Sequence, residues 1–534
     1  MVTQSIEAWR SYAKKAQDIR DTSIAQVDVD VSQISRELPL NVTGIPETIL
    51  SSHDTAITQN NDAVSLIQKM KSKELSAEEV VTAFLRRAVI ASKLTNCITE
   101  LLPNQALERA KELDQFMKQN GKVKGPLHGL PISVKEHIGM KGLTHNAGFA
   151  AWVDDIAEED AALLTVLLDA GAVLFARTTQ PQTLMANNTS SALFGETCNP
   201  HNTNLSPGGS SGGEGALVGL HGSPMGIGTD IGGSIRSPAA FNGLFGLRPT
   251  TLRLPYDGTK QARDGQESVK SVIGPIAHSV RDLQLFMKTV IDAQPWVLDP
   301  KVIPLPWREF KRDVTIGVIW EDGIVMPHPP ITRALSETVA KLKATGMKVV
   351  DLPALDHARG IDIVGSMYFP DGAADDTAIM AKSGEPWMPL TEFALKGRLV
   401  KKLSIADNWK LNLARDKFKA DYYAHVKEYG VDVVLCPANG MCATPINEAK
   451  YWAYTSIWNI LDYPAAVFPV TKCIPEIDKK VDYSPRNPDD KYNYDRYDPA
   501  FFKDAPVCLQ LVGMPWNEEL VLETVAKIDA LLNQ

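Results

Sequence analysis

The chain has 534 residues, 44% hydrophobic and 22% charged, which is the composition of an ordinary globular protein. Its formal net charge of −9 argues against a nucleic-acid partner, which needs clustered lysine and arginine. With no run of about 18 apolar residues, no apolar N-terminal leader and six irregularly spaced cysteines, we expect a cytoplasmic protein with reduced thiols and no transmembrane segment.

Helical patterns come first along the chain. Residues 1–60 are predicted to form an N-terminal helical arm, centred on residues 9–19, followed by a linker. Ser76 and Glu79 have the spacing of a capping box ahead of an apolar run, which predicts the start of a helix. Residues 104–119 then repeat apolar side chains at helical spacing.

Short apolar runs alternate with helical patterns in the rest of the chain. Helices are expected at residues 160–170, 331–344 and 518–532. Strands are expected at residues 130–134, 172–176, 314–320, 347–350, 433–435, 465–470 and 507–512. This alternation predicts an α/β fold around a largely parallel or mixed sheet that is covered on both faces. The polar, proline-containing residues 475–502 predict a long surface loop.

Residues 206–246 are the most unusual segment, with 13 glycines and six serines. Glycine weakens regular elements, but it lets the backbone turn sharply and approach a ligand closely. We therefore expect no ordinary core helix or strand here, and we expect this segment to carry chemistry.

Two glycine motifs in this segment match known functional patterns only in part. Residues 209–213 match the G-x-S-x-G nucleophile elbow with Ser211 as nucleophile, but the preceding residues predict a loop instead of the required strand. Residues 226–232 are close to a dinucleotide-binding motif, but the pattern is one residue too long and no Walker lysine follows.

A third candidate combines Lys135, Ser210 and Ser234. Lys135 ends an apolar run, which is an unusual place for a lysine, although a solvated strand end is the simple alternative. Ser234 follows two glycines whose amides could converge on one oxygen, although a tight turn explains them equally well. No histidine, His137 included, has a spacing that marks it as the partner of a catalytic serine, and no cluster suggests a metal.

Together these residues resemble the amidase signature family. The family's two glycine-serine patterns appear at Gly208–Gly215 and Gly226–Pro238, and its G-L-P-x-x-x-K pattern appears at Gly129–Lys135. Further stretches, such as residues 302–307 and 327–330, are most similar to the fungal-type acetamidases. The resemblance covers roughly residues 30–530.

The resemblance implies an α/β amidase signature fold, with a mixed, mostly parallel central β-sheet flanked by α-helices. It implies a single amidase domain over residues 61–534 that follows the arm and linker of residues 1–60. Within this domain, the catalytic core is expected at about 125–280 and a variable substrate-pocket region at about 300–460.

Site roles follow from the same resemblance. Ser234 would be the nucleophile, Ser210 the bridging serine and Lys135 the base, which requires burial to lower the lysine pKa from about 10.4 toward neutrality. The amides of Ile231, Gly232, Gly233 and Ser234 would form the oxyanion hole. Supporting roles are expected for Ser211, Thr229, Asp230 and Arg236, with Asp230 as a direct base being the alternative. No cofactor or metal is expected.

The expected reaction is hydrolysis of a small aliphatic primary amide to acid and ammonia. The candidate pocket residues are Met185, Ala186, Asn187, Tyr368 and Trp458, although core packing is an equal alternative for each aromatic residue. Arylalkyl or fatty-acyl amides are alternative substrates. An ammonia-producing amidotransferase subunit and a non-catalytic binding protein are alternative functions. The expected partner is a small-molecule amide, and assembly as a homodimer is left open.

Overall fold

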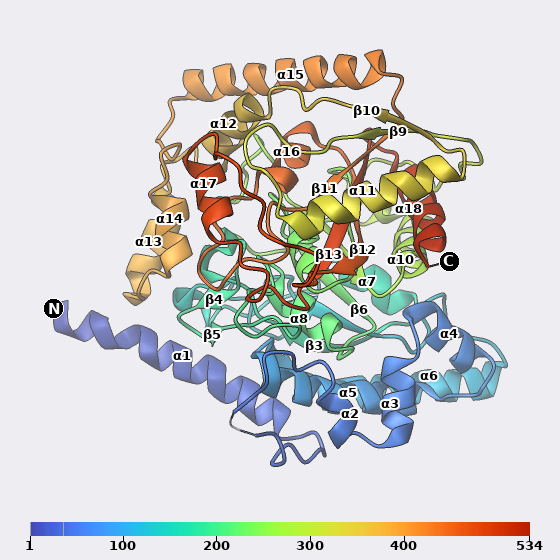
Figure 1. Ribbon diagram of the computed structural model, residues 1–534. Helices are drawn as coiled ribbons and strands as arrows, with labels where there is room; N and C mark the ends of the chain where they lie inside the picture. The colour runs from blue at the N-terminus through green and yellow to red at the C-terminus, as the bar shows by residue number, and fades with distance from the viewer. Residues whose placement is uncertain (1, 36, 534) are drawn as a thin grey trace.

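A central β-sheet of 11 strands organises the chain in this computed structural model, which describes residues 2–35 and 37–533. The strand order is β1-β3-β2-β6-β8-β7-β12-β13-β11-β9-β10, and helices cover the sheet (Figure 1). The α/β fold with a mixed central sheet is confirmed.

Parallel pairs lie toward the two ends of this sheet. They join β2 (Pro131–Lys135) to β3 (Val173–Thr178) and β6 (Met225–Asp230), and β9 (Thr315–Val318) to β10 (Lys348–Asp351) and β11 (Val433–Pro437). Antiparallel pairs fill the middle and place β1 at one edge. They involve β1 (Ile98–Leu101), β7 (Phe245–Arg248), β8 (Val272–Ala277), β12 (Ala465–Lys472) and β13 (Pro506–Gly513).

Antiparallel pairing is more frequent than the strand–helix alternation indicates. Residues 249–271 lead from β7 to β8, and residues 473–505 lead from β12 to β13. Each of these segments begins and ends at the same edge of the sheet, so the second strand runs back beside the first. A connection of this kind joins antiparallel strands, whereas a crossover is needed to join parallel ones.

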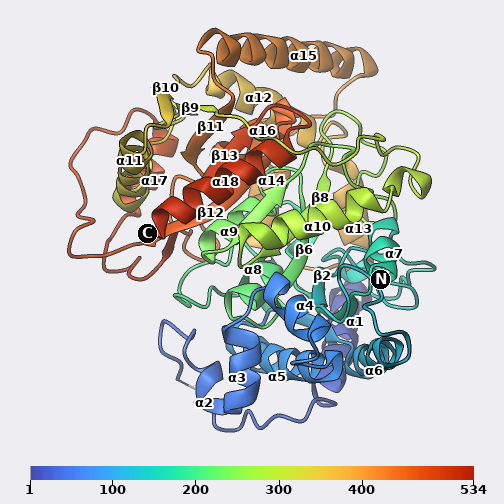
Figure 2. The same cartoon turned by 90° about the vertical axis from the view of Figure 1, so that its right-hand side faces the viewer.

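Side chains alternate between the two faces of the sheet, as β11 illustrates. Val433 and Leu435 pack with residues of α11 (Pro329–Ala344) and α18 (Glu518–Leu532). Val434 and Cys436 pack instead with residues of α12 (His357–Tyr368), α15 (Ile405–Glu428) and α16 (Ala453–Leu461). Figure 2 shows α18 beside α10 (Val280–Asp292) in front of the strands. Both faces of the sheet are therefore covered, as a two-sided α/β arrangement requires.

The N-terminal helices gather at one end of the molecule, far from α15 (Figure 1). They are α1 (Val2–Ile24), α2 (Pro46–Ile49), α3 (Ser52–Gln59), α4 (Ala63–Lys71), α5 (Ala77–Thr95) and α6 (Pro103–Asn120). Helix α1 includes residues 9–19, where the helical pattern was expected, and α2 and α3 lie within residues expected to form a linker. The capping box is also confirmed, because Ser76 and Glu79 exchange side-chain and main-chain hydrogen bonds at the start of α5.

The glycine-serine segment is more regular than expected. It contains α8 (Gly212–Gly219), β6, α9 (Arg236–Phe241) and β7, so the expectation of no ordinary helix or strand was wrong. The glycines allow these elements to approach closely. A Cβ atom on Gly213 would lie 2.4 Å from the amide nitrogen of Thr179, and one on Gly226 would lie 2.0 Å from Oε2 of Glu214.

The remaining helices include α7 (Ala162–Asp169), α13 (Ala374–Ser383), α14 (Pro389–Leu395) and α17 (Pro488–Asp495). Helix α17 lies inside residues 475–502, so the expectation of a plain surface loop was wrong. Its buried Asp490 accepts a hydrogen bond from the amide of Met326 at 2.8 Å, and Tyr497 donates one to the carbonyl of Asp478 at 2.6 Å. The contact between Asp490 and Met326 holds the segment against the body of the protein, whereas the contact between Tyr497 and Asp478 lies within the segment.

None of the helices within residues 2–35 and 37–533 is both long enough and apolar enough to cross a membrane. The six cysteines are unpaired, and five of them are buried. Burial raises the pKa of these buried thiols, for example to about 12 at Cys97.

Candidate active site

Three polar side chains from separate segments meet in the core beside β2. Lys135 is the last residue of β2 and is fully buried. Its Nζ lies 2.6 Å from Oγ of Ser210, which precedes α8, and 3.0 Å from Oγ1 of Thr229 on the neighbouring strand β6. The peptide bond between Gly209 and Ser210 is cis. The sheet therefore brings together residues that lie 75 and 94 positions apart in the sequence.

Burial favours the uncharged amine of Lys135. It lowers the pKa of Lys135 to about 7, although Asp230 and Glu214 oppose this shift. It also raises the pKa of Glu214 to about 8, because this carboxyl is fully buried. Among the described residues, the side chain of Glu214 accepts hydrogen bonds from two hydroxyl groups, those of Ser133 at 2.5 Å and Thr178 at 2.7 Å. A large fraction of Lys135 can therefore accept a proton near neutral pH.

A tight loop between β6 and α9 carries Ser234. Gly233 has a φ of +130°, which L-residues rarely adopt, and a Cβ atom there would lie 2.3 Å from Oγ1 of Thr455. Thr455 donates a hydrogen bond to the carbonyl of Gly232 at 2.7 Å, and Tyr368 donates one to the carbonyl of Ile231 at 3.3 Å. These contacts fix the direction of the loop's main-chain groups.

The four amides expected to bind an oxyanion are not equivalent. The amide of Gly233 donates to Oδ1 of Asp230 at 2.8 Å, so it is already engaged. The amides of Ile231, Gly232 and Ser234 have no hydrogen-bond partner among the residues that the structure describes. Three of the four donors are therefore available to a substrate oxygen.

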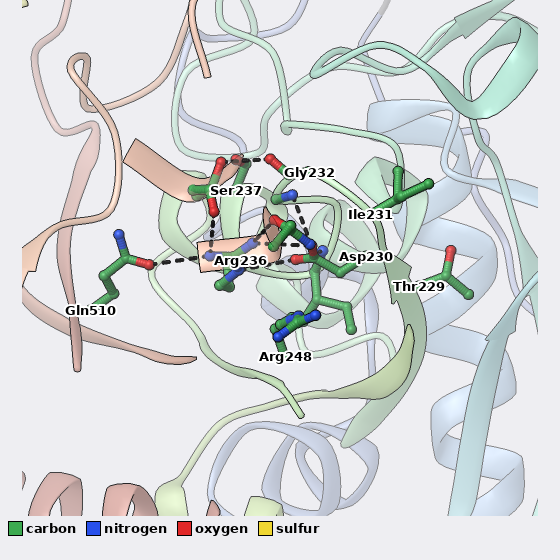
Figure 3. A network of polar contacts seen from close by, with 12 residues as sticks. Thr229, Asp230, Ile231, Gly232, Arg236, Ser237, Arg248 and Gln510 are labelled. Carbon is green, nitrogen blue, oxygen red and sulfur yellow. Dashed lines mark hydrogen bonds and ion pairs between the residues drawn. The ribbon is translucent and has the colours of Figure 1, made fainter. Parts of the chain in front are cut away.

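An ion pair beneath this loop anchors it (Figure 3). Arg236 forms a two-pronged contact with Asp230, with Nε to Oδ2 and Nη2 to Oδ1 both at 3.0 Å, and both side chains are fully buried. Asn459 donates to the same carboxylate at 2.9 Å, and Arg236 reaches the carbonyl of Thr455 at 2.9 Å and the side chain of Gln510 at 3.5 Å.

This network decides the charge state of Asp230. Burial alone would raise the pKa of Asp230, but the guanidinium of Arg236 outweighs burial and holds that pKa well below its ordinary value. The carboxylate is thus charged and saturated with donors, namely the amides of Gly233 and Ile235 and the side chains of Arg236 and Asn459. This arrangement does not suit Asp230 for the alternative role of direct base.

The competing motifs have structural explanations. Ser211 is fully buried, and its Oγ lies 3.2 Å from the amide and 3.3 Å from the carbonyl of Thr229, so it ties α8 to β6. Residues 206–209 form no strand, which leaves the nucleophile elbow without its required element. Most of residues 226–232 belong to β6 itself, so this glycine pattern is a strand and not a phosphate-binding loop.

A small pocket of about 30 Å³ opens beside Ser234. Its walls include Gly209, Ile231–Gly233 and the expected residues Met185, Ala186, Asn187 and Tyr368, together with Leu184 and Trp452.

Trp458 does not line this pocket, and its assignment to the pocket wall is corrected. It is buried in an aromatic cluster with Tyr422, Tyr463 and His357. Trp452 reaches the pocket instead, from the N-terminal cap of α16. At about 100° per residue, a separation of six residues leaves positions about 120° apart around a helix axis, so the two indoles point in different directions.

Two further buried residues near Lys135 escaped the sequence analysis. His137 contacts Oγ1 of Thr229 through Nε2 at 2.9 Å. Glu214 lies inside the first glycine-serine motif, so its position carried a signal, whereas His137 differed in no visible way from the other histidines. Residues 2–35 and 37–533 include no group of three or more His, Cys, Asp and Glu side chains arranged to hold a metal.

Comparison with known proteins identifies the family. The amidase family model matches residues 79–522. An acetamidase of Emericella nidulans is 40% identical over 501 residues, which cover 91% of each chain. An acetamidase of Aspergillus oryzae is 38% identical, covering 92% of this chain and 93% of the relative. A solved structure of a fatty acid amide hydrolase is 36% identical, with a TM-score of 0.93 over 99% of this chain and 95% of the other.

The chain belongs to the amidase family. It is an amidohydrolase of the amidase signature type, that is, an enzyme that hydrolyses carbon–nitrogen bonds of linear amides.

The ion pair beneath the loop that carries Ser234 should contribute strongly to stability. Asp230→Asn should lower the free energy of unfolding by about 3–5 kcal/mol, because it leaves the buried guanidinium of Arg236 without a counter-charge. Asp292→Asn is the matched control, since Asp292 pairs with Lys288 on the exposed surface of α10 and should change stability little. Urea unfolding of both variants measures the effect, and equal losses would contradict it.

Proposed function

We propose that Lys135, Ser210 and Ser234 form a Ser-Ser-Lys triad that hydrolyses carboxylic amides through an acyl-enzyme on Ser234. The observation that carries this proposal is the 2.6 Å contact between the buried amine of Lys135 and the hydroxyl of Ser210. Ser210 directly follows Gly209, which lines the same pocket as Ser234. The similarity of this chain to two acetamidases supports amide hydrolysis as the reaction class.

The triad would act by relaying one proton. Neutral Lys135 accepts the proton of Ser210, Ser210 takes the proton of Ser234, and Oγ of Ser234 attacks the amide carbon. The amides of Ile231, Gly232 and Ser234 would donate to the resulting oxyanion. The carbon–nitrogen bond then breaks as the proton returns through Ser210 to the leaving nitrogen, which departs as ammonia from a primary amide. Water hydrolyses the ester by the same relay.

The preferred substrate in this proposal is a small aliphatic primary amide. The pocket beside Ser234 has a volume of about 30 Å³, which suits a short acyl group better than a long one. Met185, Tyr368 and Trp452 line it, which supports a limit on acyl length.

A larger cavity favours the alternative of longer acyl or arylalkyl groups. It has a volume of about 630 Å³ and shares Met185, Tyr368 and Trp452 with the small pocket. Its other walls are mostly apolar and include Val364, Phe393 and Leu399. Movement of the shared side chains would connect this cavity to Ser234.

Substitution of the individual serines tests the mechanism. Ser234→Ala should lose activity by a factor on the order of 10⁴ or more, because the acyl-accepting oxygen is gone. Ser211→Ala is the matched control, and it should keep kcat within about tenfold, since a lost neutral hydrogen bond mainly affects stability. Mass spectrometry of the wild-type chain after a short reaction should find the acyl group on Ser234. Substantial activity in Ser234→Ala would refute the proposed role.

The pKa of Lys135 sets the expected pH dependence. The charged ammonium is present below about pH 7 and cannot accept a proton, so kcat/KM should rise with pH up to that value. On the acid side, each pH unit should lower kcat/KM about tenfold. The residual activity of Lys135→Ala should lack this acid limb. An unchanged limb in that variant would assign the titration to another group.

A panel of primary amides separates the two substrate classes. If the small pocket sets the preference, acetamide should exceed hexanamide in kcat/KM, and Trp452→Ala should reverse this order by opening the larger cavity. If the cavity already binds the acyl chain, kcat/KM should rise by roughly fourfold per added methylene in the wild-type chain. Ammonia release by the isolated chain measures these rates, and its absence for every amide would favour the amidotransferase-subunit alternative.

A further inference from the structure

Lys135 has a second hydrogen-bond partner that leads away from the serines. Its Nζ lies 3.0 Å from Oγ1 of Thr229, and the same oxygen lies 2.9 Å from Nε2 of His137. Nδ1 of His137 lies 2.8 Å from the main-chain carbonyl oxygen of Lys260. Lys135, Thr229 and His137 are buried, so water does not compete for these contacts.

The carbonyl of Lys260 decides which atoms donate and which accept in this series of hydrogen bonds. A carbonyl oxygen can only accept a hydrogen bond, so Nδ1 of His137 carries the hydrogen. In a neutral imidazole the other nitrogen, Nε2, is then an acceptor. Burial, together with the nearby Lys135, holds the pKa of His137 well below its ordinary value, which keeps the ring neutral.

Thr229 has one hydroxyl hydrogen, which it donates in a hydrogen bond to Nε2 of His137. The oxygen of Thr229 therefore faces Lys135 with its lone pairs, and Lys135 must donate an N–H to it. The hydroxyl of Ser210 has no hydrogen-bond partner besides Lys135 among the residues that the structure describes. With one N–H directed at Thr229, the lone pair of the neutral amine is left to accept the hydrogen of Ser210.

We propose that His137 is a positioning residue that orients the base of the triad. By holding the hydroxyl hydrogen of Thr229, it keeps Thr229 an acceptor and directs the lone pair of Lys135 toward Ser210. This inference rests on the proposed triad. Without His137, the hydroxyl of Thr229 could turn and donate to Lys135, which would occupy the lone pair that must take the proton from Ser210.

The fold holds His137 in place for this role. The amide of Lys260 donates to the carbonyl of His137 at 2.9 Å, in addition to the side-chain contact with the carbonyl of Lys260. The next residue, Ile138, forms an antiparallel bridge with Thr259. The two main-chain contacts thus fix the backbone at His137, and the contacts of Nδ1 with Lys260 and of Nε2 with Thr229 restrain the imidazole against rotation.

Variants of the two residues test the proposal on the full chain. His137→Leu should lower kcat, and the rate at which a fluorophosphonate probe labels Ser234, by about 10- to 100-fold, the loss typical of groups that orient a reactive side chain. KM should stay within about twofold. His137→Gln retains an acceptor near Thr229, and it should recover a substantial part of both rates.

Thr229 supplies an independent arm that does not depend on how well the His137 variants fold. Thr229→Val, which removes the hydroxyl but keeps the shape, should lose more labelling rate than Thr229→Ser. The double variant His137→Leu/Thr229→Val should label no more slowly than Thr229→Val alone, because loss of the Thr229 hydroxyl already breaks the hydrogen-bonded connection between His137 and Lys135. Thermal unfolding of each variant identifies any loss that comes from misfolding.

The outcomes separate this inference from the triad itself. His137 has no positioning role if the losses in labelling rate of His137→Leu and Thr229→Val multiply in the double variant. The same conclusion follows if His137→Gln is labelled as slowly as His137→Leu. If the probe fails to label Ser234 in the wild-type chain, or if Ser234→Ala stays active, the proposed triad fails instead.

Discussion

The burial of one amine without a counter-charge is the constraint on which the site depends. Lys135 is enclosed by the sheet and forms no ion pair with any described residue. The two carboxyls whose charges act on Lys135 are committed elsewhere, since Glu214 contacts two hydroxyls and Asp230 binds Arg236. Because an ammonium ion is poorly solvated in such surroundings, the uncharged amine becomes accessible near neutral pH. Dense packing around Lys135 maintains this condition by excluding water.

The loop that carries Ser234 is held by both halves of the chain. Asp230 and Arg236 flank Ser234, but their partners Thr455 and Asn459 belong to α16, and Gln510 belongs to β13. The motif residues and the C-terminal part of the sheet therefore form one unit. The same network withdraws the amide of Gly233 from the pocket, because charged Asp230 is the stronger acceptor.

The residues that line the pocket beside Ser234 also line a larger cavity. Met185, Tyr368 and Trp452 come from three distant segments, and the small pocket and the larger, mostly apolar cavity share them. In the proposed function these side chains set the acyl preference. Tyr368 also contacts the loop that carries Ser234, through the carbonyl of Ile231, so a change there would reach the chemistry as well. In the proposed positioning role, the His137–Thr229 contact acts instead through Lys135.

The sequence by itself determined the features that depend on neighbouring residues. The apolar period predicted helix α18 at 518–532, the observed bounds, and the Ser76–Glu79 spacing marked the start of α5. The motifs identified Lys135, Ser210 and Ser234 as candidates. Tertiary structure alone decided that the glycine-rich segment forms α8 and β6, because glycine has weak preference for either element and packing settles its conformation. It also decided that Trp452 and not Trp458 reaches the pocket, and that His137 contacts Thr229, 92 residues away, because such contacts depend on which strands and loops become neighbours.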